Sequence, residues 1–307
     1  MGKYIVRRIL QMIPVVLGAT LLIYFLNFSL PGDPTAGRCG DRACPPEYVA
    51  KFRAEYNLDE PFFVQYFLYL GKLLRGDLGT NYYGNTVVHE LAIRYPTTIK
   101  LALIAILFEI VVGIIAGIVA GIRKGKFIDN LVIVSTLVFI SIPVFVVGGL
   151  SQFIFGIKLG WFPVTSGEGS WGQLILPGLV LGSLSVAYTA RLTRTSLVEN
   201  LRADYVRTAK AKGLSTARSV GIHALRNSLL PVITYIGASF GVLMGGAIVT
   251  ERIFNVNGIG NFIWRSISQR DGVSVVGAVV CLVIVYLVVN LIVDILYGIL
   301  DPRISHD

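Results

Sequence analysis

Long apolar stretches without a charged side chain constrain this chain more than any other feature. Ile9–Leu30 contains 22 such residues, about 33 Å as a helix, enough to cross the ~30 Å hydrocarbon core of a bilayer. Hydrophobic residues make up 54% of the 307 residues, and the mean hydropathy is +0.70. A soluble domain of this size is less apolar. We therefore expect an all-α polytopic membrane protein, because helices satisfy their own backbone polar groups in lipid.

Six stretches are apolar enough to be transmembrane helices. They are Ile9–Leu30, Ile99–Ile122, Leu131–Ile157, Leu174–Ala190, Leu229–Thr250 and Val273–Leu300. The apolar core of the first is too long for a signal peptide, so we expect it to be retained. Pro143 should kink the third. Two stripes of glycines at about four-residue steps predict close packing against another helix. The first is Gly113, Gly117 and Gly121, and the second is Gly237, Gly241, Gly245 and Gly246.

The distribution of Lys and Arg predicts the orientation. The N-terminus, residues 123–130, residues 191–231 and the C-terminus together hold fifteen Lys and Arg, against four in the short opposite loops. Both termini should therefore be cytoplasmic. This organisation gives an N-terminal segment with the first helix (1–30), an extracytoplasmic domain (31–97), a five-helix core (98–300) and a cytoplasmic tail (301–307). The net charge of +9 lies beside apolar spans, which argues against nucleic-acid binding.

The extracytoplasmic domain should contain two short helices. PPEYVAKFRAEYNL reads as a helix opened by prolines, and PFFVQYFLYLGKLLRGDLG reads as a helix with a broad aromatic face that needs a partner. Cys39 and Cys44 would face an oxidising compartment, which favours a local disulfide over two free thiols. No His lies nearby, so we do not expect a metal site there.

The segment 191–231 is the most densely basic part of the chain. Asp204 is a plausible N-cap and Gly213 a plausible stop for a first short helix, and Ser215 can cap a second that runs towards Asn227. The first helix would offer a small-residue face to the groove of another protein. An ordinary positive-inside loop is the alternative.

Two acidic residues fall within the predicted spans. Glu109 is costly in lipid, so it either lines a water-filled pathway or accepts a hydrogen bond from within its own or a neighbouring helix. Asp294 lies near the inner end of its span, and we expect it to be structural.

Motifs for catalysis are missing from the sequence. There is no G-x-x-x-x-G-K-[ST] phosphate loop and no G-x-S-x-G elbow, and His89-Glu90 is not followed by His at position 93, which is Ile. We expect no enzyme activity, cofactor or metal in this chain.

Three segments carry a resemblance to a known family: YVRTAKAKGLS, ALRNSLLPVITYIG and GGAIVTERIFNVNGIG. They resemble the permease subunits of bacterial ABC importers of the dipeptide/oligopeptide branch, and the resemblance covers nearly the whole chain, from RRIL to LDPR. In the family's EAA-x3-G-x9-I-x-LP pattern, Arg207, Thr208 and Ala209 take the EAA positions, Gly213 takes the glycine, and His223 and Leu225 take the I and L positions. The sequence departs from the pattern at Arg207, His223 and Arg226, where the family has Glu, Ile and Pro.

The resemblance implies a type I ABC importer permease fold with an extracytoplasmic insertion between the first two helices. Such a chain would form half of a pathway for di- or oligopeptides in the bacterial inner membrane. Its partners would be a second homologous permease, two cytoplasmic ATPase subunits that bind ATP and Mg, and an external substrate-binding lipoprotein. Nickel and glutathione importers use similar permeases, and the exact substrate stays open. An ion channel or secondary transporter is the alternative of another class.

The residue patterns and the resemblance together predict roles for individual residues. Coupling to the ATPase is expected of Asp204, Val206, Arg207, Ala209, Lys210 and Gly213, with Val206, Ala209 and Gly213 making the shape contacts. The pathway or gate is expected at Glu109, Gly241, Met244 and Gly245. Docking of the binding protein is expected at Phe62, Phe63, Tyr66, Phe254 and Asn255. Asn257 replaces the family's usual Pro in that last segment, which weakens a rigid-gate role.

Overall fold

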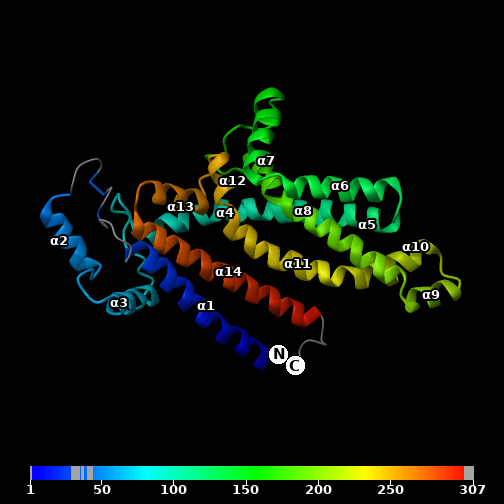
Figure 1. The fold of residues 1–307 in the computed structure, drawn as a ribbon, viewed down its shortest axis with the longest axis horizontal. Helices are drawn as coiled ribbons and strands as arrows, with labels where there is room; N and C mark the ends of the chain where they lie inside the picture. Colours follow the sequence, from blue (N-terminus) through cyan, green and yellow to red (C-terminus); the bar gives the residue numbers. More distant parts are fainter. Residues whose placement is uncertain (1, 29–34, 36–37, 40–43, 301–307) are drawn as a thin grey trace. The chain divides into compact units, whose positions relative to one another are not determined.

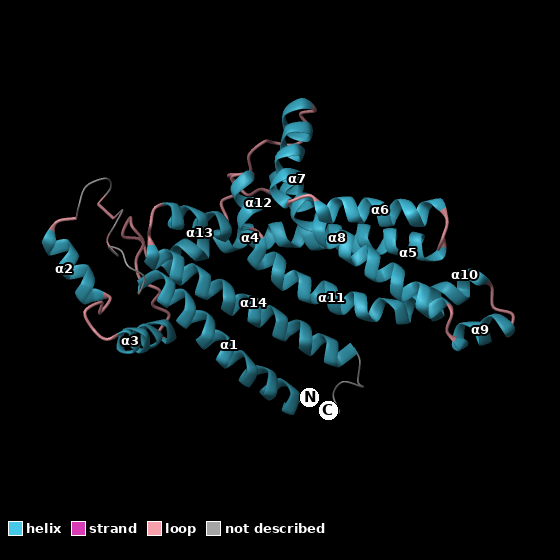
Figure 2. Ribbon diagram, in the orientation of Figure 1, coloured by secondary structure: helices cyan, strands magenta, loops and turns pink. Residues whose placement is uncertain are grey.

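The computed structural model describes residues 2–28, 35, 38–39 and 44–300, and this part of the chain is helical (Figures 1 and 2). The predicted tail 301–307 and the last two residues of the first predicted span, 29 and 30, lie outside the described residues. The helices, with three π-helical segments (η), are α1 Gly2–Phe28, α2 Pro46–Glu55, α3 Phe62–Leu74, α4 Val87–Phe108, η1 Glu109–Gly113, α5 Ile114–Ile122, α6 Phe127–Ser141, α7 Val144–Ser151, η2 Gln152–Lys158, α8 Trp171–Leu201, α9 Asp204–Ala211, α10 Thr216–Arg218, η3 Ser219–Ala224, α11 Leu225–Gly246, α12 Ile248–Ile253, α13 Ile259–Ser268 and α14 Gly272–Leu300.

The predicted membrane architecture is confirmed. Within the described residues, five helical stretches are long and apolar enough to span a bilayer: Ile5–Phe28, Val87–Ile122, Trp171–Leu201, Ser219–Met244 and Gly272–Ile295. The pair Phe127–Ser141 and Val144–Lys158 is apolar enough as well, and counts as a sixth span if the two bent helices are taken together. The predicted kink at Pro143 is in fact a break with a 100° bend. The residue before proline is held in the extended region, here Ile142 with φ −91° and ψ 124°, which ends α6.

Three helices extend beyond the apolar stretches predicted as spans, because they continue through charged residues. The second span begins at Val87 rather than Ile99, since Glu90 and Arg94 pair one turn apart. The fourth continues beyond Ala190 to Leu201. The fifth begins as a helix at Thr216, so the connection predicted at 191–231 is reduced to 202–215 around α9.

The chain divides into two compact units. The first unit contains residues 1–98 and 257–307. In it α1 and α14 lie side by side (Figure 1), and Arg8 pairs with Asp294 at 3.3 Å, which gives Asp294 a structural contact. Tyr24, Tyr66, Val276 and Val280 form a buried cluster that joins α1, α3 and α14. The two helices predicted between residues 31 and 97 are confirmed as α2 and α3, and Pro46 occupies the first position of α2.

The second unit, residues 99–256, is built around α8, which contacts α5, α6, α7, η1 and α11. The first glycine stripe faces this helix, as the sequence predicts for a close-packing face. A Cβ at Gly117 would come within 2.6 Å of the Ala190 carbonyl oxygen, and one at Gly113 within 2.8 Å of the Thr189 side chain. Larger residues in the stripe would therefore push α8 away.

Candidate coupling segment and buried polar contacts

Helix α9 stands on a small apolar core. Val206 is fully buried and clusters with Leu197 of α8 and Ala224 of η3, with Ile118 and Leu201 packed against them. Ala209, one turn further along α9, is 7% exposed. Val206 and Ala209 are therefore turned away from solvent, and their contact with another protein stays a prediction. Their side chains face this chain and hold α9 in place, because the apolar side of an amphipathic helix packs on the nearest apolar surface.

Gly213 ends α9, and Ser215 caps the helix that follows. Gly213 has φ +85°, and the Leu214 amide donates to the Ala209 carbonyl at 3.2 Å, as in a glycine-terminated helix. The Ser215 hydroxyl accepts the Arg218 amide at 3.4 Å and caps the next helix, as the sequence predicts. Asp204 begins the helix rather than preceding it.

The exposed side of α9 is polar. Asp204 and Arg207 approach to 3.6 Å, with side chains 95% and 74% exposed, and Thr208, Ala211 and Lys212 are exposed as well. The side chain of Lys210 lies outside the described residues. Tyr205, which sequence reasoning missed, is an exposed aromatic whose hydroxyl donates to Asn200 Oδ1. The sequence feature that could have identified Tyr205 is its position next to Val206, on a side of the helix that is not the apolar one. Tyr and Arg are enriched at protein–protein interfaces, so Tyr205 and Arg207 are the residues of this surface best suited to contact another protein.

A buried ion pair ties α8 to the turn between α5 and α6. Arg194 donates from Nε and Nη2 to the Asp129 carboxylate, the Nη2 bond being 2.7 Å, and the Gly125 amide adds a bond of 2.8 Å. Asp129 is 1% exposed. Arg194 is one of the basic residues of segment 191–231, yet its side chain makes a contact within the second unit. Because the arginine binds two carboxylate oxygens in parallel, it fixes orientation as well as distance.

Glu109 lies at the meeting point of three helices. Its carboxylate accepts the Thr189 hydroxyl of α8 at 2.7 Å and the Ser239 hydroxyl of α11 at 2.8 Å, and the residue is fully buried. Of the two alternatives for Glu109, this arrangement is the hydrogen-bonded one. Gly241 and Met244 are also buried, and the burial of Gly245 is not described. The gate assignment of these residues stays a prediction.

Only Phe63 and Asn255 are exposed among the docking residues predicted for the binding protein. Phe254 is fully buried, and its carbonyl accepts the Ser166 amide at 2.8 Å. Tyr66 is 5% exposed and faces α1, so neither residue is available for docking as the chain stands. Phe62 is half-buried in the α1 cluster, whereas Phe63 and Asn255 are exposed.

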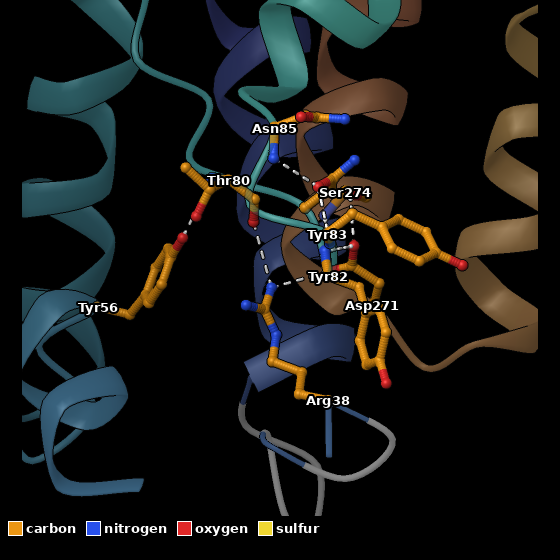
Figure 3. A network of polar contacts seen from close by, with 9 residues as sticks. Arg38, Tyr56, Thr80, Tyr82, Tyr83, Asn85, Asp271 and Ser274 are labelled. Atoms are coloured by element: carbon orange, nitrogen blue, oxygen red, sulfur yellow. Dashed lines mark hydrogen bonds and ion pairs between the residues drawn. The ribbon is translucent and has the colours of Figure 1, made fainter. Parts of the chain in front are cut away.

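A polar network braces the segment between α1 and α4 in the first unit (Figure 3). Arg38 pairs with Asp271 at 2.9 Å with both side chains nearly buried, and it donates to the Thr80 carbonyl at 3.2 Å. Asp271 also accepts the Tyr82 amide at 2.8 Å and the Ser274 hydroxyl at 2.7 Å. Burial raises the pKa of the Tyr56 phenol, whose oxygen accepts the Thr80 amide.

The disulfide expected from the sequence adjoins this network. Cys39 and Cys44 are joined, with their Cα atoms 5.2 Å apart, and Cys39 directly follows Arg38. The network as a whole links the loop at residue 38, the residues before α4 and the start of α14. Because Asp271 has its oxygens occupied by four donors, this contact is structural.

Comparisons with known proteins agree with this architecture. The family described as "Binding-protein-dependent transport system inner membrane component" matches residues 113–306, and its N-terminal counterpart matches residues 1–102. The di/tripeptide transport system permease protein of Pseudomonas aeruginosa is 38% identical over all of this chain and 99% of its own length. The dipeptide transport system permease protein of Alkalihalophilus pseudofirmus and the glutathione transport system permease protein of Salmonella paratyphi A are each 36% identical over the full length of both chains. A multi-pass helical chain with these full-length matches belongs to the family of binding-protein-dependent transport system inner membrane components.

Proposed function

We propose that this chain is a permease subunit of an ATP-driven importer and forms half of the pathway for di- and oligopeptides. The names of the two peptide permeases that match over the full length support the substrate class. The absence of a phosphate loop from the sequence supports an external source of energy. The partners would be a second permease, two cytoplasmic ATPases that hold ATP and Mg, and a substrate-binding lipoprotein. The Lys and Arg distribution supports cytoplasmic termini and places α9 on the ATPase side.

The observation that carries this proposal is the construction of α9. A short helix with a polar exposed side is fastened by Val206 to Leu197, near the end of the 31-residue helix α8. The same helix α8 reaches the Arg194–Asp129 pair, the glycine stripe and the Thr189–Glu109 bond. Movement of an ATPase bound to α9 would therefore move α8 and its neighbours together, because close-packed cores transmit displacement.

This construction changes which residues we assign to coupling. Arg207 and the exposed neighbours Tyr205, Thr208 and Ala211 take the place of Val206 and Ala209 as contacts of the ATPase. Gly213 sets the end of the helix. Exposed ion pairs contribute only ~0–1 kcal/mol each, so apolar and shape contacts must supply most of the docking energy.

The test replaces one exposed residue on α9. Ala211→Trp should block docking by bulk, so that the ATPases no longer co-purify and peptide uptake falls to background. A tryptophan at exposed Lys124, in the α5–α6 turn, is the matched control and should leave both unchanged. Normal uptake by the Ala211→Trp variant would refute the coupling role of α9. Uptake that continues without ATP would favour a channel or secondary transporter instead.

Glutathione is a second candidate substrate, because a glutathione permease matches this chain at 36% identity. Competition separates the two. Unlabelled glutathione in excess should leave uptake of labelled dialanine unchanged if peptides are preferred, and should abolish it if glutathione is the main substrate.

A further inference from the structure

Helix α3 has three sides of different chemistry. Phe62, Tyr66, Tyr69, Leu70 and Leu73 face the cluster around Tyr24 of α1. The opposite side exposes only apolar side chains: Phe63, Val64, Phe67, Leu68 and Leu74. The narrow third side carries Gln65 and Lys72.

The polar groups of the third side are turned towards the neighbouring extracytoplasmic residues. The Gln65 amide donates to the Glu60 carbonyl at 2.6 Å. The Lys72 ammonium donates to the Glu55 carbonyl at 2.6 Å and lies 5.4 Å from the centre of the Tyr56 ring. Lys72 is the single charged residue of α3, and its contacts direct it towards the end of α2. The exposed apolar side therefore carries no charge.

Contacts with α1 place α3 at the depth of a membrane span. The Tyr66 hydroxyl donates to the Leu17 carbonyl at 2.9 Å and lies 2.8 Å from Thr20 Oγ1, and both residues are inside the span Ile5–Phe28. The Phe62 ring lies 5.7 Å from Phe25 and 6.2 Å from Tyr24, in the last turns of the same span. Tyrosine and phenylalanine rings gathered at the end of a span mark a membrane–water interface.

We infer that α3 is an interfacial helix whose Phe63, Val64, Phe67, Leu68 and Leu74 side chains are immersed in the lipid of the leaflet at the Phe28 end of α1. Leu22, Phe25 and Leu26 of α1 are exposed and apolar as well, and the Phe25 ring lies beside Phe62 of α3. An apolar side in acyl chains and a polar side at the headgroups is the arrangement of amphipathic helices that lie in the plane of a membrane.

The occupant of this surface could instead be the binding protein, but the chemistry favours lipid. Protein-contact surfaces carry hydrogen-bonding groups around their apolar centre. The exposed side of α3 has none between Phe63 and Leu68 apart from Gln65 and Tyr66, whose polar atoms bond within the unit. The inference holds whatever substrate the chain transports, since it depends only on the span and on α3.

A nitroxide label tests this inference. Phe67→Cys is labelled in a Cys281→Ser background, and the full transporter is reconstituted in vesicles of phosphatidylethanolamine and phosphatidylglycerol. Collision with oxygen, which concentrates in lipid, is compared with collision with a water-soluble nickel chelate. Leu22→Cys on α1 is the lipid-facing control, and Lys51→Cys on α2 is the water-facing control.

We expect the label at position 67 to behave like that at 22, with oxygen collisions several times more effective than those of the chelate. A label at 67 that resembles the one at 51 would place α3 in water and overturn the inference. Low access to both reagents, or loss of oxygen access when the binding protein is added, would overturn it in favour of a protein contact. Should the Phe67→Cys variant fail to assemble, Val64→Cys on the same side gives the same comparison.

Discussion

Helices α3 and α9, one in each unit, are built alike and differ in what they expose. Each is a short amphipathic helix fastened by a buried side chain, Tyr66 in α3 and Val206 in α9. The free side of α3 is apolar, whereas that of α9 is polar and charged around one tyrosine. The fastened sides determine where the helices are held. The free sides determine whether lipid or protein is the suitable partner.

The way each helix is fastened also differs. Tyr66 combines ring contacts with hydrogen bonds to Leu17 and Thr20, because unpaired polar groups are costly at the depth of a span. Val206 needs only packing, since α9 is bordered by water on its other side. The comparison therefore predicts that a polar substitution on the free side destabilises α3 but leaves the stability of α9 unchanged.

The largest effect is expected at the base of α9. Val206→Asp would bury a carboxylate without a partner in a fully buried site, which costs about 3 kcal/mol or more. We expect α9 to detach, to become cleavable by protease, and to lose the ATPase, while the spans still insert. Thr208→Asp places the same charge on the exposed side and should leave protease resistance intact. Equal resistance of the two variants would show that α9 is not fastened by Val206.

The next effect is expected on the free side of α3. Phe67→Asp would place a charge among lipid chains near the interface, at a cost somewhat below the ~2.5–3.5 kcal/mol of a charge at mid-span. Its measure is the thermal stability of the chain in vesicles. The control is Ala50→Asp on an exposed position of α2, which should change nothing. A stability of Phe67→Asp equal to that of the control would mean that α3 lies in water.

Sequence patterns identified both helices because their signals are local. Prolines before Glu47, the aromatic periodicity from Phe62, and Gly213 at the end of α9 act through the backbone of their own turns. What each side of α3 and α9 contacts depends on residues far away in the sequence. The apolar positions Val206 and Ala209 could have been assigned to the chain's own core by the ordinary rule for amphipathic helices.

The extensions of the helices beyond the predicted spans have a common physical cause. In a sequence, charged residues indicate where an apolar span ends. A helix can nevertheless continue past a charged residue whose charge is paired within the protein. Arg194 meets Asp129, which lies 65 positions earlier, and this pairing cannot be read from the local sequence. The donors to Glu109, Thr189 and Ser239, are equally distant, so the sequence left its two roles open.

A smaller effect is expected from the hydroxyl of Tyr66. Tyr66→Phe keeps the ring but removes the bonds to Leu17 and Thr20, at about 1 kcal/mol for each typical hydrogen bond. We expect a lower unfolding temperature in vesicles with unchanged assembly. Tyr69→Phe is the control, because the Tyr69 hydroxyl has no hydrogen-bond partner among the described residues. If both variants lose stability equally, the hydroxyl of Tyr66 does not anchor α3.

The smallest effect on stability is expected at Arg207, and here function should respond instead. The Asp204–Arg207 pair is exposed, and such pairs contribute little because water and salt screen them. Arg207→Ala should therefore leave the unfolding temperature unchanged, yet weaken ATPase binding severalfold at low salt and less at high salt. Arg218→Ala, an exposed arginine beyond α9, is the control for net charge. If the two variants bind the ATPase equally well, the polar side of α9 gives no specific orientation, and its contribution must come from Tyr205 and Ala211 alone.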